Sequence, residues 1–414
     1  LGAVMGAKRL KALVVQGDRD TPLADRPRVL ALAKDLAERS LGPATAKYRE
    51  LGPAGNLATM NRLGALPTRN FTAGAWDAAE SVSAEALRER PGHERASCAN
   101  CTIGCEHRYA VGEASVRVEY ESLFALGPLC GLAEPEAVIE ASRRCDALGL
   151  DTISTGGTLA FAMECVERGL LEAGPRFGDA ESLLQGIEDI AQRRGLGDLL
   201  AEGSRRAAER IGGEAPRFAA HVKGLELPGY EPRALQTLAL GFAVGTRGAD
   251  HNKSSAYELD FSDRVDRLHG DAESARLALE PEDRAALLDS LILCKFLRGA
   301  FDDVYAESAA MLEAVTGLDF TADELRRVAR RVVDLRKAFN QREGWQPEDD
   351  TLPARFLEEP LVGGAVAGAR LTRERLDAMV RSYNLARGWS ARGQVSPRAV
   401  ADLALDVAQP VGTA

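Results

Sequence analysis

The sequence has no long hydrophobic run and no tract rich in lysine and arginine. Glycine or a charged residue breaks every apolar stretch before it reaches the roughly 18 residues that a membrane-spanning helix needs. Acidic residues outnumber basic ones, 62 to 52, and the net charge of -10 disfavours binding to nucleic acid. We therefore expect neither a membrane nor a nucleic-acid partner.

Cysteine is scarce, with seven residues in a chain of 414. An odd number spread over a long chain does not fit the disulfide framework of a small secreted protein, so we expect a reducing, cytoplasmic location. The first residues, Leu1-Gly-Ala-Val-Met-Gly6, contain no initiator methionine at position 1 and no leader. We therefore expect the chain to be part of a longer protein.

What the sequence does contain is mostly the pattern of helices. Hydrophobic residues make up 45% of the chain and charged residues 28%, which is typical of a globular protein of two or three domains. Apolar residues at helical spacing, punctuated by Gly and Pro, predict a mainly α fold. Helices are expected at 27–40, 135–148, 157–170, 180–193, 197–211, 272–299 and 305–315, and from Thr321, where Glu324 completes a capping box. A β-branched run at 12–15 predicts one short strand, and the loop-like stretch 211–229 is the best internal boundary.

Three cysteines lie together in Cys98-Ala-Asn-Cys101-Thr-Ile-Gly-Cys105. A short loop can direct three thiolates to one point, and such soft ligands select an iron-sulfur cluster or zinc. Three clustered cysteines with one remote partner are common for a 4Fe-4S cluster, whereas structural zinc sites usually combine two CxxC-like pairs. We favour the cluster over zinc, with Cys294 as its fourth ligand in a segment expected to be helical.

The other cysteines and the histidines beside this loop carry weaker signals. Cys130, Cys145 and Cys165 are expected to be small buried residues without a metal role. His93 and His107 flank the loop and are expected to be solvated.

Two segments share the form Asp-x-x-x-Leu followed by Asp or Cys. They are Asp146-Ala-Leu-Gly-Leu-Asp151 and Asp289-Ser-Leu-Ile-Leu-Cys294, one on each side of the expected boundary. An aspartate near a helix end is most often a cap or part of a solvated face, so either segment alone is a weak signal. The shared form suggests two related roles.

Seven motifs occur in one order along the chain. They are Gly2–Lys8, Leu66–Phe71, the CxxCxxxC loop, Glu119–Ser122, Leu148–Gly156, Phe339–Gly344 and Asp349–Pro353. Through these motifs the sequence resembles the tungsten-dependent aldehyde:ferredoxin oxidoreductase family, nearly from end to end.

The resemblance implies two helical domains that close over a bis-pterin tungsten cofactor, whose base is a β-rich N-terminal domain. Residues 1–20 then correspond to the end of that N-terminal domain, 21–218 to the second domain with the CxxCxxxC loop, and 219–414 to the third domain with Cys294. The strand expected at 12–15 would be left from the first domain. Residues 1–414 alone are expected to be inactive, because one wall of the cofactor site would be missing.

The resemblance also implies which residues hold the cofactors. They are Asp146 and Asp151 for one pterin, Asp289 and Leu293 for the other, and Cys98, Cys101, Cys105 and Cys294 for a 4Fe-4S cluster beside one pterin. Carboxylates suit pterins because they can accept hydrogen bonds from ring N–H groups. One departure is Ile292, which stands where the family usually has glycine.

In family members a glutamate and a histidine face the metal, and the local matches are Glu121 and His251. Converting an aldehyde to an acid adds the oxygen of water and removes two electrons and two protons. The carboxylate can serve as base, and the imidazole can polarise the carbonyl or carry a proton. Glu119 is the rival to Glu121, since either could point inward.

The leading prediction is an enzyme that oxidises a small aldehyde to a carboxylic acid at a tungsten, or less favourably molybdenum, bis-pterin centre. Electrons would leave through the cluster to ferredoxin or a similar carrier. Two alternatives stay open: a tungstopterin reductase of carboxylates or aromatic acyl thioesters, and an iron-sulfur electron-transfer or scaffold subunit. A homo- or hetero-oligomer is compatible with each.

Overall fold

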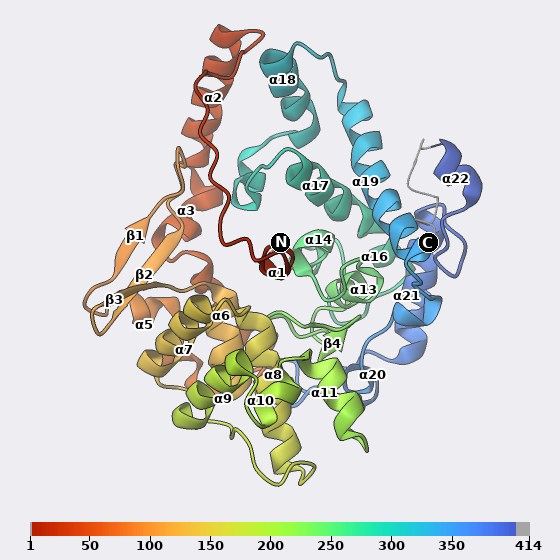
Figure 1. Ribbon diagram of the computed structural model, residues 1–414. Coiled ribbons are helices and arrows are strands. Elements are labelled where there is room, and N and C mark those ends of the chain that lie inside the picture. Colours follow the sequence, from red (N-terminus) through yellow and green to blue (C-terminus); the bar gives the residue numbers. More distant parts are fainter. Residues whose placement is uncertain (1, 403–414) are drawn as a thin grey trace.

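Helices dominate the computed structural model, which describes residues 2–402 (Figure 1), and this confirms the predicted mainly α fold. Before the first sheet the helices are α1 (Gly2–Ala7), α2 (Arg26–Ser40), α3 (Pro43–Glu50), η1 (Pro53–Gly55), α4 (Asn56–Arg62), η2 (Asp77–Val82) and α5 (Ala84–Arg88). Between the two sheets they are α6 (Tyr120–Leu126), η3 (Pro128–Cys130), α7 (Pro135–Leu148), α8 (Thr152–Glu167), α9 (Ala180–Gln192), α10 (Leu196–Leu200), α11 (Gly203–Ile211) and α12 (Ala215–Phe218). After the second sheet they are α13 (Gln236–Val244), α14 (His251–Ser254), α15 (Tyr257–Asp260), α16 (Ala272–Leu277), α17 (Leu279–Ser290), η4 (Lys295–Ala300), α18 (Val304–Thr316), α19 (Ala322–Arg342), η5 (Pro347–Asp349), α20 (Ala354–Glu358), α21 (Arg373–Ala386) and α22 (Pro397–Asp402).

The strands form two small antiparallel sheets. β1 (Glu94–Ala96), β2 (Glu106–Val111) and β3 (Ala114–Arg117) pair in that order, and β4 (His221–Val222) pairs with β5 (Leu225–Glu226). Ala96 pairs with Glu106, so the first sheet fixes both ends of the cysteine loop between β1 and β2.

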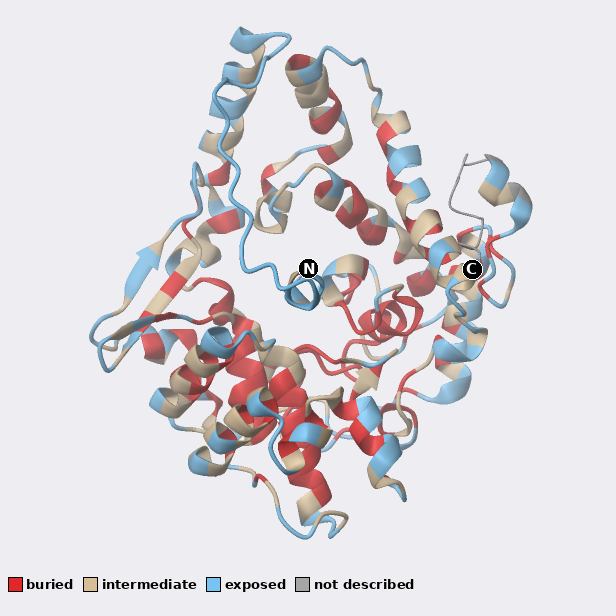
Figure 2. Cartoon of the chain, viewed as in Figure 1, coloured by how far each residue is buried: buried red, intermediate tan, exposed pale blue. Residues whose placement is uncertain are grey.

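The core is centred on α6, α8 and α13, which are buried along most of their length (Figure 2). Helix α8 crosses α6 very closely: a Cβ on Gly156 would lie 2.3 Å from the carbonyl oxygen of Ala125. Only glycine permits this approach, and any side chain there would push the two helices apart. Among residues 2–402, no single helix is long and apolar enough to cross a membrane, and the one pair of segments that passes jointly, Tyr120–Cys130 with Pro135–Leu148, bends by 120°.

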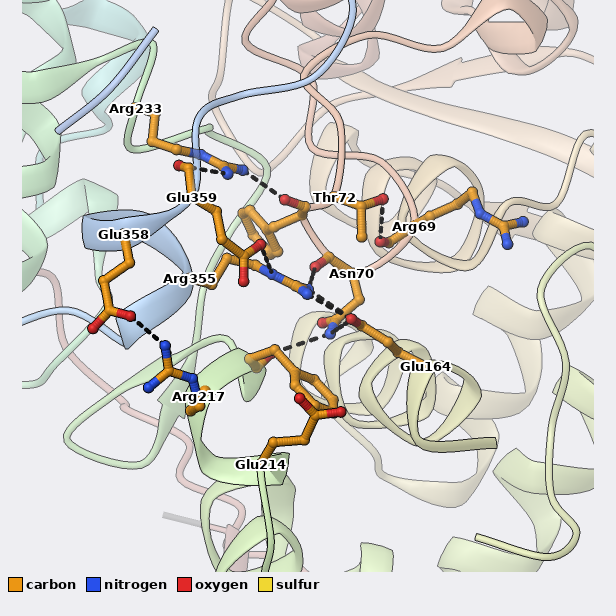
Figure 3. A network of polar contacts seen from close by, with 12 residues as sticks. Arg69, Asn70, Thr72, Glu164, Glu214, Arg217, Arg233, Arg355, Glu358 and Glu359 are labelled. Atoms are coloured by element: carbon orange, nitrogen blue, oxygen red, sulfur yellow. Dashed lines mark hydrogen bonds and ion pairs between the residues drawn. The ribbon is translucent and has the colours of Figure 1, made fainter. Parts of the chain in front are cut away.

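A buried ionic network ties the 66–74 loop to the core (Figure 3). Asn70 and Phe71 have positive φ angles of 50° and 62°, and their carbonyl oxygens accept hydrogen bonds of 2.6 Å from Arg355 and Arg233. Arg355 also pairs with Glu164 of α8, at 2.5 Å. Burial raises the pKa of Glu164, but hydrogen bonds from Arg355 and Asn70 outweigh this and leave it below its ordinary value. The network thus stabilises a strained backbone turn that the chain could not hold alone.

Distant parts of the chain meet where α2 lies beside α18 (Figure 1). The backbone N–H of Asp25 donates to the carbonyl of Ala314 at 2.8 Å, and Arg39 pairs with Glu307 at 2.5 Å. This contact joins residues on both sides of the proposed division into 21–218 and 219–414, which stays a prediction.

Most predicted helices are confirmed, and the differences occur at caps and breaks. α7 has the predicted bounds 135–148, and Thr321 and Glu324 form the capping box that begins α19. The helix predicted at 157–170 begins earlier, at Thr152, because Asp151 caps it. The helix predicted at 197–211 breaks into α10 and α11 at Gly203, whose φ is +85°.

Two predictions of local structure are wrong. The helix predicted at 272–299 divides into α16, α17 and η4, so Cys294 lies after the end of α17 and not within a helix. Residues 12–15 form no strand but an exposed extended segment, with Val14 88% exposed. Within residues 2–402 they make no backbone hydrogen bond to another strand, and β propensity alone cannot form a strand without a partner.

Candidate functional site

Glu121 and His251 face the same cavity, which has a volume of about 480 Å³. Its lining comes from α3, η1, α4, the end of β3, the first turn of α6, the start of α8, the loop at 230, α14, α15 and η4. The lining residues include Lys47, Tyr48, Arg117, Glu119, Glu121, Thr152, Tyr230, His251, Tyr257, Phe261, Lys295, Phe296 and Arg298. Oε1 of Glu121 lies 3.5 Å from Nε2 of His251, so the fold brings together the two predicted catalytic residues.

Glu121 lies in the first turn of α6 and is held at one oxygen only. Its Oε2 accepts a hydrogen bond of 2.8 Å from the backbone N–H of Gly229. Its Oε1 is buried and has no hydrogen-bond partner in the described part of the chain. Burial raises the pKa of Glu121 to about 8; the Gly229 hydrogen bond opposes this, and the charges of Asp151 and Asp250 add to it. At neutral pH the carboxyl group is therefore mostly protonated.

His251 is the first residue of α14, and Asp250 caps that helix. The Asp250 side chain accepts hydrogen bonds from the backbone N–H groups of Asn252 and Lys253, at 2.8 and 3.1 Å. Burial lowers the pKa of His251 to about 4, although the charge of Asp250 opposes the shift. The imidazole is therefore neutral, so the contact with Glu121 is not an ion pair but a pair of neutral acid-base groups.

Glu119, the rival to Glu121, is engaged elsewhere. It pairs with Arg117 at 2.7 Å and is positioned at the N-terminus of α6. Burial raises its pKa, while Arg117 lowers it. Glu119 also lines the cavity, but the glutamate in contact with His251 is Glu121.

Aromatic rings enclose the pair. The ring of Tyr230 lies 5.0 Å from that of His251 and 5.6 Å from that of Tyr257, with which it stacks. The hydroxyl of Tyr120 donates to the carbonyl of Gly229, the residue that also binds Glu121. These contacts shield part of the pair from water and hold the Gly229 backbone in place.

The four predicted cluster cysteines are free thiols on two neighbouring segments. Cys98 and Cys294 are exposed, and Cys101 and Cys105 are half-buried. Burial raises the pKa of Cys105 to about 11, and the charges of Glu119, Cys294 and Cys101 contribute, so Cys294 lies near the loop. Among residues 2–402, however, no three His, Cys, Asp or Glu side chains are already arranged to hold a metal ion.

The predicted pterin aspartates have different surroundings. Asp146 is exposed and lines a separate polar hollow of about 580 Å³ beside β2 and β3. Asp151 caps α8 by accepting from the N–H of Ser154 at 2.8 Å. Asp289 pairs with Lys253 at 2.5 Å. Asp146 therefore does not line the cavity of Glu121, whereas Asp151 begins the helix whose next residues do.

Ile292 and Leu293 connect Asp289 with Cys294. The N–H of Leu293 donates to the carbonyl of Leu288 at 2.9 Å. Ile292 has a φ of +58° and is 93% exposed. This left-handed conformation is unfavourable for a β-branched residue and natural for glycine. The structure thus shows why glycine would suit this position, and that Ile292 is accommodated with strain.

Sequence reasoning missed some residues of the site and misjudged two histidines. Lys253 lies two residues after His251, and Lys295 directly follows Cys294. This closeness to predicted site residues was the signal that could have identified both lysines. His107 is buried and not solvated: its Nδ1 lies 2.9 Å from Nε2 of His93, and the two rings stack. The His107 ring packs closely against Gly52, where a Cβ would lie 2.8 Å from it, and this long-range contact cannot be predicted from the local sequence.

Comparison with known proteins agrees with this fold. The family model for aldehyde ferredoxin oxidoreductase, domains 2 and 3, matches residues 32–405. A tungsten-containing aldehyde ferredoxin oxidoreductase of Thermococcus kodakarensis is 37% identical over 421 residues, which cover 97% of this chain and 68% of the relative. A protein of the same name from Pyrococcus furiosus is 37% identical over 425 residues, covering 98% and 68%.

The solved active site complex BamBC of benzoyl coenzyme A reductase, in complex with 1,5-dienoyl-CoA, shares the fold. It superposes with a TM-score of 0.75 at 19% identity and covers 98% of this chain and 69% of that chain. The fold and the comparisons together define an oxidoreductase. The chain belongs to the aldehyde ferredoxin oxidoreductase family, as its motifs predicted.

Proposed function

We propose that this protein oxidises an aldehyde to a carboxylic acid at a tungsten bis-pterin centre, with electrons leaving through a 4Fe-4S cluster to ferredoxin or a similar carrier. The observation that carries the proposal is the contact between Glu121 and His251 in an aromatic cavity, where Oε1 of Glu121 has no partner in the described chain. A buried carboxyl oxygen without a partner fits a group that binds there.

The residues present fit the cofactors by their chemistry. Cys98, Cys101, Cys105 and Cys294 would hold the cluster, since all four are free thiols and thiolates are the ligands of such clusters. Asp146, Asp151, Asp289 and Leu293 would contact the pterins. When bound, tungsten would supply a two-electron acceptor, and the cluster would supply a one-electron relay.

The protein's own residues would handle the protons. A carboxyl group whose pKa is about 8 is partly ionised at neutral pH, and its ionised form can take a proton from water that adds to the carbonyl carbon. The neutral imidazole of His251 can donate an N–H hydrogen bond to the carbonyl oxygen and pass a proton to or from Glu121. The aromatic side chains around them keep bulk water out.

Because residues 1–414 alone are expected to be inactive, the test uses the metal-loaded protein together with the β-rich domain that would complete the cofactor site. It is run under anaerobic conditions, with benzaldehyde as substrate and benzyl viologen as electron acceptor. We expect stoichiometric benzoate and two reduced viologens per benzoate, with tungsten and about four irons per chain. The reductase alternative predicts instead that reduced viologen is consumed with benzoyl-CoA and that benzaldehyde gives no turnover. Iron without tungsten or turnover would favour the electron-transfer subunit.

A further inference from the structure

The cavity beside Glu121 and His251 is lined to a large extent by aromatic side chains. Only 5% of the residues in the chain are aromatic. Six of them nevertheless line this one cavity: Tyr48, Tyr120, Tyr230, Tyr257, Phe261 and Phe296. The aromatic residues are therefore concentrated at the site, and the shape and chemistry of these rings decide which molecules fit there.

Two of the rings lead away from the acid-base pair. The ring of Tyr257 lies 6.1 Å from the imidazole of His251, and the ring of Phe261 lies 6.2 Å from that of Tyr257. Tyr257 begins α15 and Phe261 directly follows its end, so the spacing of four residues places both side chains on the same face. A molecule whose reacting group lies at His251 would therefore extend along these two rings.

Phe261 is the most exposed of the six aromatic residues. Its exposed fraction is 43%, whereas that of Tyr257 is 9% and that of Tyr230 is 5%. The other three are buried or intermediate. Single exposed phenylalanines are common on protein surfaces, but this one lines the cavity of the acid-base pair. Because covering apolar surface is favourable, its ring offers a contact to a bound molecule.

The neighbouring rings pair by stacking, which favours a flat ring as the bound group. Tyr230 stacks on Tyr257 with centroids 5.6 Å apart and an angle of 16° between the ring planes. Tyr48 stacks on Phe296 at 4.2 Å and 26°. Aromatic pairs in stacked or edge-to-face arrangements gain free energy beyond the burial of their area. A saturated ring of the same size covers the same apolar surface without this additional gain.

We propose that Tyr257 and Phe261 bind the aromatic ring of the substrate, so that this enzyme prefers aromatic aldehydes to saturated aldehydes of the same size. The inference rests on the proposed aldehyde oxidation and adds the substrate class. The formyl group lies at Glu121 and His251, and the ring lies along Tyr257 and is covered in part by Phe261. Phe261 is then a residue that determines specificity.

The test compares benzaldehyde with cyclohexanecarbaldehyde in the holoenzyme that includes the β-rich domain, as the ratio of their kcat/KM values. The two aldehydes differ in intrinsic reactivity, but this difference is the same for every variant and cancels when ratios are compared. We expect Phe261→Leu to lower the ratio about 2- to 12-fold, the range for losing one aromatic pair. Phe261→Tyr should keep the wild-type ratio, because the ring remains.

Phe339→Leu is the matched control. Phe339 is 44% exposed, almost the same as Phe261, but it belongs to α19 and lines a different hollow. Its replacement should leave the ratio of the two aldehydes unchanged. An equal fall of the ratio in both variants would overturn the inference, because the change would then reflect a general effect on the fold and not a contact with the substrate.

Product binding gives a second readout that does not depend on turnover. Calorimetry should show that benzoate binds the wild-type holoenzyme more tightly than cyclohexanecarboxylate does, and that Phe261→Leu reduces the difference. Equal affinities in the wild type, or wild-type ratios in Phe261→Leu, overturn the inference while leaving aldehyde oxidation intact. Loss of tungsten or iron in Phe261→Leu also overturns it, because the ring would then contact a cofactor. Failure of the wild type to oxidise either aldehyde would refute the proposed function itself.

Discussion

The acid-base pair and the cysteine loop are built in different ways. Glu121 and His251 are mostly enclosed, with side chains 18% and 14% exposed, and backbone groups position them: Gly229 holds one carboxyl oxygen, and Asp250 caps the helix that begins with His251. The cysteines lie in a loop and after a helix end, and no three potential ligands within residues 2–402 are arranged around one point. The comparison indicates that the fold itself positions the acid-base pair, whereas the proposed cluster would have to draw its four cysteines together.

The largest effect is expected from removing a cluster ligand. Cys294→Ala should lose most of the roughly four irons per chain expected for a 4Fe-4S cluster, because Cys294 would supply the ligand from outside the loop. Iron analysis and the bleaching of the visible absorbance by dithionite measure this. Cys145→Ala is the matched control, since Cys145 is buried in α7 away from the loop, and it should keep its iron. One stoichiometric zinc in the anaerobically purified wild type would contradict the cluster.

Removing the imidazole should leave the metals and reduce the rate. His251→Asn keeps a side chain that can form hydrogen bonds but cannot exchange a proton near neutral pH. We expect kcat to fall about 10²- to 10⁴-fold, the usual range for a general acid-base group. Activity per tungsten should be compared, so that lost cofactor is not mistaken for lost catalysis. A variant with wild-type activity per tungsten would show that His251 has a structural role.

The pH dependence of the wild type and of Glu121→Gln together tests whether Glu121 is the base. A base acts in its deprotonated form, so kcat/KM of the wild type should rise with pH up to about 8, the raised pKa of Glu121, and level off above it. The increase should be about tenfold per pH unit on the acid side. This ionisation should be absent from the residual activity of Glu121→Gln. A rise that persists in Glu121→Gln would assign the ionisation to another group.

The smallest effect concerns the strained connection to Cys294. Ile292→Gly removes the penalty of the left-handed conformation, about 1–2 kcal/mol, but adds conformational freedom to the unfolded chain. We expect a net stabilisation of about 0.5–1 kcal/mol in denaturant unfolding. The control Ser290→Gly lies at the end of α17 and should be neutral or destabilising. Destabilisation by Ile292→Gly would mean that the isoleucine makes a favourable contact that outweighs the strain.

The sequence predicts the regular parts of the fold well, because the signals are local. The ends of α7 and the capping box of α19 follow from residues within one helical turn. The prediction of a strand at 12–15 is wrong because a strand needs a pairing partner, and the local sequence does not show whether one is present. The helix predicted across Ile292 is wrong because isoleucine itself does not favour a positive φ; the glycine usual at this position in the family was the available signal.

The site was predictable in its residue types but not in its contacts. Motifs pointed to Glu121 and His251, yet the distance between them depends on how α6 and α14 pack. Gly229 binds Glu121 through its backbone N–H, and a backbone donor is invisible in a sequence. Asp146 matched the motif as well as Asp151 did, and only the structure places it outside the cavity.

The role of Glu121 is tested most directly by comparing the turnover per tungsten of two variants, Glu121→Gln and Glu119→Gln, at saturating benzaldehyde. Glutamine keeps the shape of either side chain and removes its proton chemistry. Because Glu121 contacts His251 and Glu119 is paired with Arg117, we predict that Glu121→Gln loses about 10²- to 10⁴-fold in kcat. Glu119→Gln should stay within a few-fold of wild type. Full activity in Glu121→Gln, with or without loss in Glu119→Gln, would contradict the role assigned to the buried pair.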